Sequence, residues 1–274
     1  MTQPTYAISE EQVRFYQENG YIQLLEVLTP QELEQARSAL DGVLKMELDQ
    51  KHDLTGRDPN YDRVFTQKVN LWQVDEGMRQ YVFSPKLAEI AQRLTRARSI
   101  RLWHDHALIK MPGNSKPSAW HQDLPYWPMV EGGALSCWMA LDDVSEANGC
   151  MAFVPGSQRF GRLQPISLTN PQDLFGLVPV EVRGPTELKG VFQPMPAGSC
   201  TFHNGMTFHY AGPNTTDRPR RAIVTIYLPD EVHFNGHRHI VTDDLQLNEG
   251  DVLAGERFPL LAGDRSRATV ARPS

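Results

Sequence analysis

The sequence has few cysteines and no long apolar run, and these two deficits exclude several classes of protein. Its 274 residues include three cysteines, Cys137, Cys150 and Cys200, with no CxxC pair among them. Neither a disulfide framework nor a sulfur-ligated zinc site is indicated, and we expect the thiols to be reduced and buried. No stretch of about 18 apolar residues, the length that a membrane-spanning helix needs, occurs in the sequence.

Basic residues are outnumbered by acidic ones. Lysine and arginine total 27 against 33 aspartate and glutamate residues, a net charge of -6, whereas binding to nucleic acid requires a basic stripe. The first residues lack a basic segment followed by an apolar core, and the sequence does not finish in a peroxisomal Ser-Lys-Leu signal. These observations favour a cytoplasmic protein with neither a nucleic-acid nor a membrane partner.

Capping residues in the first hundred positions predict a helical flank. Ser9 has Gln12 at the capping-box position, and Thr29 precedes Pro30 at a first helical position. The predicted flank consists of a helix from Ser9 to Gly20, an apolar run from Tyr21 to Leu28, a helix from Pro30 to about Asp49, an exposed loop from Asp53 to Asp62 and a helix from Glu76 to Leu94.

From residue 99 onward, short runs rich in β-branched and aromatic residues are bounded by Pro, Gly and Asn, which predicts a sandwich or barrel of strands. Asn204-Gly205 between two of these runs predicts a two-residue hairpin. Pro179 would confine the run that contains it to a sheet edge. The predicted strands are Ile100 to Met111, Ala134 to Leu141, Met151 to Val154, Val178 to Val182, Ser199 to His203, Thr207 to Ala211 and Ala222 to Leu228.

The sequence WHQD at residues 120–123 is the strongest pointer to chemistry. Alternate side chains of a strand project to one face, so His121 and Asp123 can contact the same ion. A third histidine follows far downstream, either His203 or His209. Two histidines and one carboxylate on one face of an ion leave its other positions open, the arrangement associated with non-haem Fe(II) oxygenases.

Five motifs follow one another along the chain. They are Lys110-Met-Pro-Gly, Trp120-His-Gln-Asp-Leu-Pro-Tyr-Trp-Pro, Trp138-Met-Ala-Leu-Asp-Asp-Val-Ser-Glu-Ala-Asn-Gly-Cys, Val154-Pro-Gly-Ser, and His209-Tyr-Ala-Gly-Pro-Asn followed by Arg220-Arg-Ala. An HxD motif alone is weak evidence, but in this order the set resembles the phytanoyl-CoA dioxygenase family of Fe(II)- and 2-oxoglutarate-dependent oxygenases. The similarity runs, with interruptions, from the first helix to about residue 230.

The resemblance implies a mainly β fold in a single domain. Its core would be a double-stranded β-helix, the jelly-roll or cupin-like arrangement, with N-terminal helices. We expect residues 1–95 to form the helical flank, residues 99–230 the β-helix core and residues 231–274 a C-terminal extension. The implied cofactors are Fe(II), 2-oxoglutarate as cosubstrate, and O2. In such enzymes decarboxylation of 2-oxoglutarate yields succinate and a ferryl species that removes hydrogen from a nearby C–H bond.

The resemblance also assigns roles to individual residues. The family's distal histidine precedes a small residue, an asparagine and then an arginine, which fits His209 better than His203, expected to line the pocket or pack. By the same match Arg220 binds the 5-carboxylate of 2-oxoglutarate, with Arg218 and Arg221 as alternatives. The implied set is His121, Asp123 and His209 as metal-binding and catalytic residues, and Arg220, Lys110 and Trp138 around 2-oxoglutarate.

Several other residues carry weaker expectations. The family often has serine where this chain has Ala211, which removes one hydrogen bond to the cosubstrate. Asn235-Gly236 breaks any helix that would align the histidines around it, so a solvated or pocket-covering loop is predicted there. The histidines of that loop are His233, His237 and His239, and the residues interpreted as core or loop positions rather than substrate contacts are Gln67, Asn70, Tyr126 and Trp127.

The expected activity is hydroxylation of an unactivated C–H bond in a small organic molecule. Asp123 argues against halogenation, because halogenating relatives lack this carboxylate. Desaturation, epoxidation and ring closure by the same oxidant are alternatives. A zinc hydrolase also uses two histidines and a carboxylate but has no use for Arg220 or Lys110, and a non-catalytic cupin-like binding protein has no need of all three ligands. Substrate and oligomeric state are not indicated.

Overall fold

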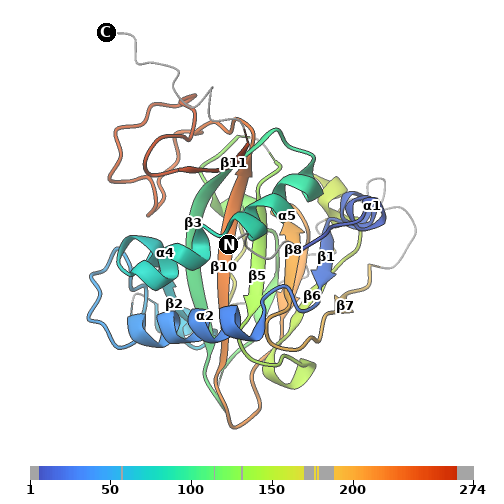
Figure 1. Ribbon diagram of the computed structural model, residues 1–274, viewed down its shortest axis with the longest axis vertical. Helices are drawn as coiled ribbons and strands as arrows, with labels where there is room; N and C mark the ends of the chain where they lie inside the picture. Colours follow the sequence, from blue (N-terminus) through green and yellow to red (C-terminus); the bar gives the residue numbers. More distant parts are fainter. Residues whose placement is uncertain are drawn as a thin grey trace.

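Two antiparallel β-sheets form the centre of the molecule. The computed structural model describes residues 6–56, 58–113, 115–130, 132–169, 176, 178 and 188–263. The larger sheet has the order β1-β8-β5-β10-β3-β11, with β2 also paired to β3, and the smaller has the order β4-β9-β6-β7 (Figure 1). The strands are β1 (Tyr21–Leu24), β2 (Thr66–Val69), β3 (Ser99–Lys110), β4 (Ser118–His121), β5 (Leu135–Ala140), β6 (Met151–Phe153), β7 (Val191–Phe192), β8 (Cys200–Asn204), β9 (His209–Ala211), β10 (Arg220–Pro229) and β11 (Leu260–Gly263).

The helical flank precedes and covers the larger sheet. Ser9 and Thr29 each form a capping box, with Gln12 and with Glu32 respectively, and Gly20 ends the first helix in the left-handed conformation, as predicted. The α-helices are α1 (Glu10–Asn19), α2 (Pro30–Val43), α3 (Pro59–Asp62), α4 (Glu76–Val82) and α5 (Pro85–Thr95), and the 3-10 helices are η1 (Leu71–Gln73), η2 (Leu124–Tyr126), η3 (Glu146–Asn148) and η4 (Ser157–Phe160).

Three predictions for the flank need correction. The helix expected over residues 76–94 is two helices, because Pro85 cannot continue a helix and disfavours helical backbone at Ser84 before it. The second helix ends at Val43 rather than near Asp49, after Gly42 has weakened its last turn. The loop expected over residues 53–62 contains the short helix α3.

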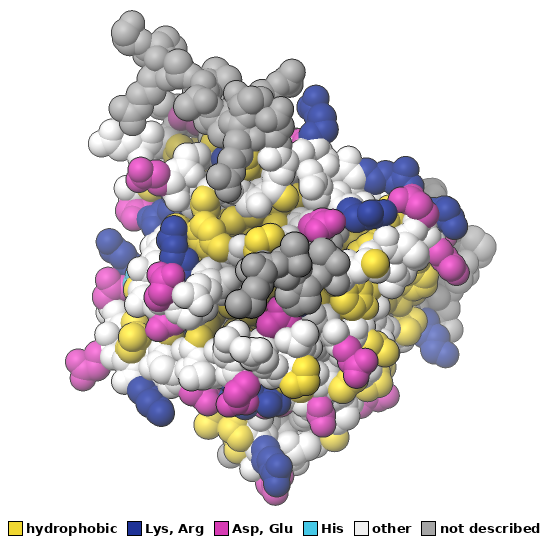
Figure 2. Space-filling view, in the orientation of Figure 1, with side chains coloured by type: hydrophobic (Ala, Val, Ile, Leu, Met, Phe, Trp, Pro, Cys, Tyr) yellow, Lys and Arg dark blue, Asp and Glu magenta, His cyan; other side chains and the backbone are white. Residues whose placement is uncertain are grey.

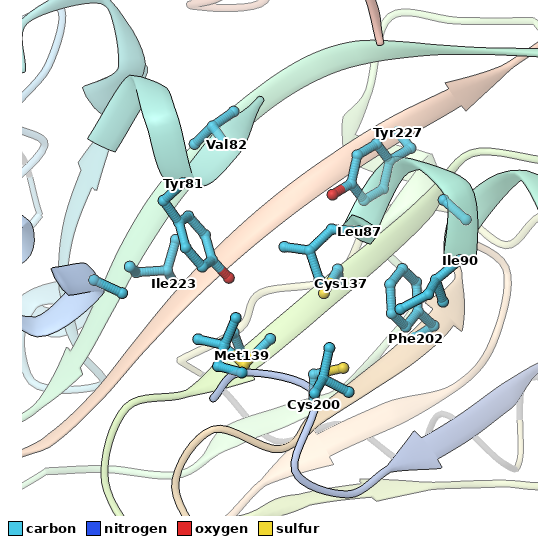
Figure 3. Close-up of a cluster of buried hydrophobic side chains, with 14 of the residues drawn as sticks. Tyr81, Val82, Leu87, Ile90, Cys137, Met139, Cys200, Phe202, Ile223 and Tyr227 are labelled. Carbon is cyan, nitrogen blue, oxygen red and sulfur yellow. The ribbon is translucent and has the colours of Figure 1, made fainter. Parts of the chain in front are cut away.

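One apolar core lies between this flank and the larger sheet. Side chains from α4 and α5 interdigitate with side chains from β5, β8 and β10, as Figure 3 shows around Leu87, Cys137 and Phe202. All three of these side chains are fully buried. The three cysteines of the chain are free and buried, as expected. A second apolar cluster, around Trp138, Phe153 and others, fills the side of the larger sheet that faces the smaller one.

The predicted hairpin at Asn204-Gly205 is wrong. The strands on its two sides belong to different sheets: β8 pairs with β1 and β5, whereas β9 pairs with β4 and β6. A hydrogen bond from the Thr207 backbone N–H to the Asn204 carbonyl (2.8 Å) closes the turn, and the chain then crosses to the smaller sheet. As a result His203 and His209 approach each other from opposite sheets, with ring centroids 4.6 Å apart.

Four strands at the sheet margins were not predicted, namely β1, β2, β7 and β11, whereas β4 contains His121 of the strand assumed around the WHQD motif. The predicted strand over residues 178–182 lies outside the described residues except for Val178. Among the described helices none is long and apolar enough to cross a membrane. On the face drawn in Figure 2, basic side chains are interspersed with acidic ones.

Candidate metal centre and cosubstrate pocket

Three side chains converge where β4 and β9 lie side by side. His121 and His209 are opposite each other in the ladder of these strands. One ligand atom each from His121, Asp123 and His209 lies within 4.8 Å of the other two. Oδ1 of Asp123 is 3.6 Å from Nε2 of His121 and 3.4 Å from Nε2 of His209. We call this group the His-Asp-His triad; three atoms so spaced can share one divalent ion at bonds of about 2.0–2.2 Å.

Backbone carbonyls fix both imidazoles of the triad in the orientation that a metal requires. Nδ1 of His121 lies 2.7 Å from the Ala119 carbonyl, and Nδ1 of His209 lies 3.0 Å from the Thr207 carbonyl. A carbonyl oxygen only accepts, so each Nδ1 carries the proton and each Nε2 keeps a lone pair for an ion. Burial, followed by the neighbouring His209, lowers the pKa of His121 and so favours its neutral, ligating form.

Asp123 reaches the triad in a way that the strand argument did not foresee. β4 ends at His121, and Asp123 has helical backbone angles (φ -77°, ψ -44°) at the start of η2. Oδ2 of Asp123 accepts a hydrogen bond from Ser136 Oγ (3.0 Å) and lies 3.3 Å from His203 Nε2. The other oxygen, Oδ1, lies near the Nε2 atoms of His121 and His209. Burial alone would raise the pKa of Asp123, but the imidazoles around it hold the pKa well below its usual range.

His203 and Gln122 support the triad without belonging to it. His203 is buried and contacts Oδ2, the outer oxygen of Asp123. Among the described side chains, only the three of the triad are close enough together to share a metal ion, and His203 is not one of them. Gln122 points away, as expected, and donates to the carbonyls of Gly161 and Met206 (both 2.8 Å). These bonds hold the turns on either side of the triad.

Arg220 is a buried cation with spare hydrogen-bonding capacity. Its guanidinium carbon lies 5.0 Å from the centre of the Trp138 ring, and its Nε is 3.5 Å from the Asn148 carbonyl. Its Nη1 is buried and has no hydrogen-bond partner in the described part of the chain. Burial lowers the pKa of Arg220 to about 10, so it remains charged at neutral pH. An unpaired buried donor is costly, and a bidentate carboxylate would satisfy it.

Lys110 lies directly opposite Arg220 on the neighbouring strand but has different contacts. Its Nζ donates to the carbonyls of Val64 (3.2 Å) and Lys116 (2.7 Å). Burial, and then the charge of Arg220, lower the pKa of Lys110 to about 6. Lys110 is not among the described residues that line the cavity, so its predicted contact with 2-oxoglutarate stays a prediction.

The two alternative arginines lie elsewhere. Arg221 follows Arg220 on β10 and therefore points to the opposite face of the sheet, where it forms ion pairs with Asp142 (2.7 Å) and Asp41 (2.8 Å). Arg218 is exposed in the preceding loop. Of the three arginines, only Arg220 lines the cavity that contains the triad.

This cavity has a volume of about 440 Å³. It is lined by the triad, Arg220, Trp138 and Ala211, and also by Gln67, Tyr126 and Trp127, three residues interpreted from the sequence as core or loop positions. Asn70 lies outside it. His104, His106 and His239 form a polar part of its wall. Sequence reasoning missed His104 and His106, whereas His239 belongs to the loop predicted to be solvated or pocket-covering. His104 and His106 alternate along β3, and the period-two pattern could have placed them on one face.

Comparison with known proteins agrees with this geometry. The family model for phytanoyl-CoA dioxygenase (PhyH) matches residues 16–222, which include the triad, Trp138 and Arg220. The chain belongs to the phytanoyl-CoA dioxygenase family.

Similar proteins include both curated sequences and solved structures. Peroxisomal phytanoyl-CoA dioxygenase of Bos taurus is 24% identical over 248 residues, which cover 85% of this chain and 72% of that protein. The 2-oxoglutarate-dependent carbocyclase SnoK from nogalamycin biosynthesis is 29% identical, with a TM-score of 0.75 over 93% of this chain and 97% of that one. The epimerase SnoN, in complex with Fe3+, alpha ketoglutarate and nogalamycin RO, is 29% identical with a TM-score of 0.75, over 92% and 98% of the two chains.

Membership of the phytanoyl-CoA dioxygenase family decides the class of chemistry. The protein is a 2-oxoglutarate-dependent non-haem iron dioxygenase whose cofactors are Fe(II), 2-oxoglutarate and O2. The predicted jelly-roll core with flanking helices is confirmed. Neither the zinc hydrolase nor the non-catalytic binding protein is favoured.

Proposed function

We propose that this dioxygenase hydroxylates an unactivated C–H bond of a small organic metabolite, with release of succinate and CO2. His121, Asp123 and His209 hold the iron in this proposal. The supporting observation is that two imidazoles and a carboxylate converge in a cavity that is also lined by Arg220, whose Nη1 has no partner among the described residues. An iron site and a carboxylate site in one cavity are what this chemistry requires.

Arg220 binds the 5-carboxylate of 2-oxoglutarate in the proposal. A guanidinium can form two parallel bonds to a carboxylate, and burial beneath the Trp138 ring excludes water that would compete. Bound iron, 2-oxoglutarate and O2 together supply the oxidant. The protein holds the cosubstrate carboxylate at a fixed distance from the triad and so orients the reacting groups.

The segment over residues 161–169 shields the site from water. The Tyr126 hydroxyl donates to the Ile166 carbonyl (2.5 Å) and accepts from the Ile166 N–H (3.2 Å). Arg162 donates to the carbonyls of Met129 (2.9 Å) and Leu124 (3.2 Å). These bonds hold apolar side chains of the segment against the cavity, where exclusion of water protects a reactive oxidant from side reactions.

Other outcomes of the same oxidation remain alternatives, because the similar structures include a carbocyclase and an epimerase. Product mass separates three groups of outcome: hydroxylation and epoxidation add one oxygen atom, desaturation and ring closure remove two hydrogen atoms, and epimerisation leaves the mass unchanged. Epoxidation is told from hydroxylation by the loss of a carbon–carbon double bond.

Two measurements test the proposal. Under anaerobic conditions, Fe(II) plus 2-oxoglutarate should give the wild-type protein a weak visible charge-transfer band, and the His209→Ala protein should lack it. In air, a screen of small metabolites for succinate release, followed by mass spectrometry of the products, should identify a substrate that gains oxygen. A wild-type protein without the band would contradict the ligand assignment, and a product without added oxygen would reject hydroxylation.

A further inference from the structure

Three histidines that do not belong to the triad line the same cavity. His104 and His106 lie two residues apart on β3, and their ring centroids are 5.3 Å apart. His239 comes from the C-terminal segment, and its ring centroid is 6.2 Å from that of His104. We call these three side chains the histidine wall. Their ligand atoms are not close enough together to form a metal-binding group like the triad, within the part of the chain that the structure describes.

Hydrogen bonds with the backbone fix the tautomers of two of these histidines: the proton is on Nδ1 in His104 and on Nε2 in His239. Nδ1 of His104 lies 3.2 Å from the Asp105 carbonyl, which only accepts, so His104 keeps an accepting Nε2. Nδ1 of His239 accepts the Val241 backbone N–H (3.2 Å), so the proton of a neutral His239 is on Nε2, which donates. The wall therefore offers one acceptor, Nε2 of His104, and one donor, Nε2 of His239.

His106 adds unused hydrogen-bonding capacity to the wall. Its Nδ1 is buried and has no partner among the described residues. A buried polar nitrogen is costly unless a ligand or water satisfies it. Burial lowers the pKa of His106 and of His239 to about 4 and that of His104 well below its usual value, so all three are neutral at physiological pH.

The charges around the cavity define what the wall can bind. The charged side chains in its described lining are Asp58, Asp123 and Arg220. Asp123 belongs to the triad and Arg220 to the cosubstrate in the proposed function, so the remaining described charge is the negative Asp58. A phosphate or other anionic group on a substrate would therefore lack a cationic partner here.

Aromatic side chains line the same cavity. Tyr61, Phe65 and Trp127 line it together with the histidine wall. Flat apolar surfaces of this kind favour a ring over a flexible chain, because stacked rings bury a large area and lose little conformational entropy.

We propose that the histidine wall recognises an uncharged, ring-containing substrate through its hydroxyl or carbonyl groups, with His104 accepting and His239 donating a hydrogen bond. This inference rests on the proposed function, which assigns iron to the triad and 2-oxoglutarate to Arg220 in the same cavity. One hydroxyl can donate to His104 while a second accepts from His239, so a ring with two hydroxyls matches the wall better than a ring with one. A ring that carries a phosphate matches it worst.

Anaerobic calorimetry on the enzyme loaded with Fe(II) and 2-oxoglutarate tests this order with three probes. The probes are 2,7-dihydroxynaphthalene, 2-naphthol and 2-naphthyl phosphate, which share a ring and differ in polar groups. One additional hydrogen bond contributes about 0.5–1.5 kcal/mol, so the diol should bind roughly 2- to 12-fold more tightly than 2-naphthol. The phosphate should bind more weakly than either.

Variants of the wall assign the preference to its residues. His239→Phe and His104→Phe should each reduce the preference for the diol toward onefold, and the partly exposed position of His239 keeps that variant informative if the buried one fails to fold. His237→Phe, an exposed histidine of the same loop, should keep the full preference. The charge-transfer band checks that the iron site of each variant is intact.

The possible failures are distinguishable. A missing charge-transfer band in the wild-type protein would contradict the proposed function itself. With the band present, the inference alone is overturned by tightest binding of the phosphate, by binding of none of the probes, or by a diol preference that survives both His239→Phe and His104→Phe.

Discussion

The His-Asp-His triad and the histidine wall, which line one cavity, are built on opposite principles. At the triad, each polar atom that does not face the ion already has a protein partner: carbonyls bind the Nδ1 atoms of His121 and His209, and Ser136 binds the outer oxygen of Asp123. At the histidine wall, which lines the same cavity, the buried Nδ1 of His106 has no described protein partner. The protein thus preorganises the triad by itself and leaves the hydrogen bonds of the histidine wall to be completed by a ligand.

Removal of the triad carboxylate should have the largest effect. Asp123→Ala leaves two imidazoles and should abolish turnover, because the ion loses its only anionic protein ligand and one of three anchors. Ser136→Ala is the matched variant, since it removes a hydrogen bond to Asp123 and spares the carboxylate. Loss of such a supporting partner typically costs 10- to 100-fold in metal affinity. Full turnover by Asp123→Ala would remove this residue from the ligand set.

Alanine substitution of His209 and of His203, one at a time, tests which of these two histidines is a ligand of the metal. His209→Ala should lose iron binding in anaerobic titrations, because it deletes a ligand. His203→Ala should retain binding at an affinity roughly 10- to 100-fold lower, because His203 contacts only the outer oxygen of Asp123. The reverse order of the two affinities would make His203 the ligand.

Arg220 and Arg221 sharpen the comparison because consecutive residues of one strand face opposite sides of the sheet. A charge-assisted bond contributes roughly 1.5–3 kcal/mol, so Arg220→Ala should raise the 2-oxoglutarate concentration needed for half-maximal rate by roughly ten- to a hundred-fold. Arg221→Ala should leave that requirement unchanged and lower the melting temperature instead, because its ion pairs with Asp142 and Asp41 lie outside the cavity. An unchanged requirement in Arg220→Ala would contradict the assignment.

The same contrast explains what the sequence could predict. Capping boxes and short motifs are local, so α1, the start of α2 and the pair His121 and Asp123 were recognisable from a few neighbouring letters. The choice of His209 over His203 came from the family resemblance. The turn at Asn204-Gly205 has hairpin composition, yet whether β9 returns to β8 or crosses to the other sheet depends on long-range pairing. His239 reaches the cavity from a segment more than a hundred residues away from His104. The local Asn235-Gly236 pattern left open whether its loop was solvated or covered the pocket, and did not indicate its approach to His104.

Lys110, opposite Arg220 on the neighbouring strand, predicts how the stability of the protein depends on pH. Burial depresses its pKa to about 6, below the value of about 10.4 in an unfolded chain. Between these values the unfolded chain binds more protons than the folded one, so this lysine makes stability rise as pH increases. Lys110→Met removes that slope. The difference in unfolding free energy, variant minus wild type, should therefore fall between pH 6 and pH 9 in denaturant titrations, and a constant difference would show that Lys110 is charged when buried.

The smallest expected effect concerns a hydrogen bond that this chain lacks. Ala211 lines the cavity two residues after His209, at a position where relatives often carry a serine that donates to 2-oxoglutarate. Its side chain is nearly buried, so an added hydroxyl would face the cavity with little competition from water. Ala211→Ser should lower the 2-oxoglutarate requirement by roughly 2- to 12-fold, the equivalent of one hydrogen bond. Ala211→Val adds volume without a donor and serves as the control. A serine variant that behaves like the valine variant would place the cosubstrate carboxylates out of reach of β9.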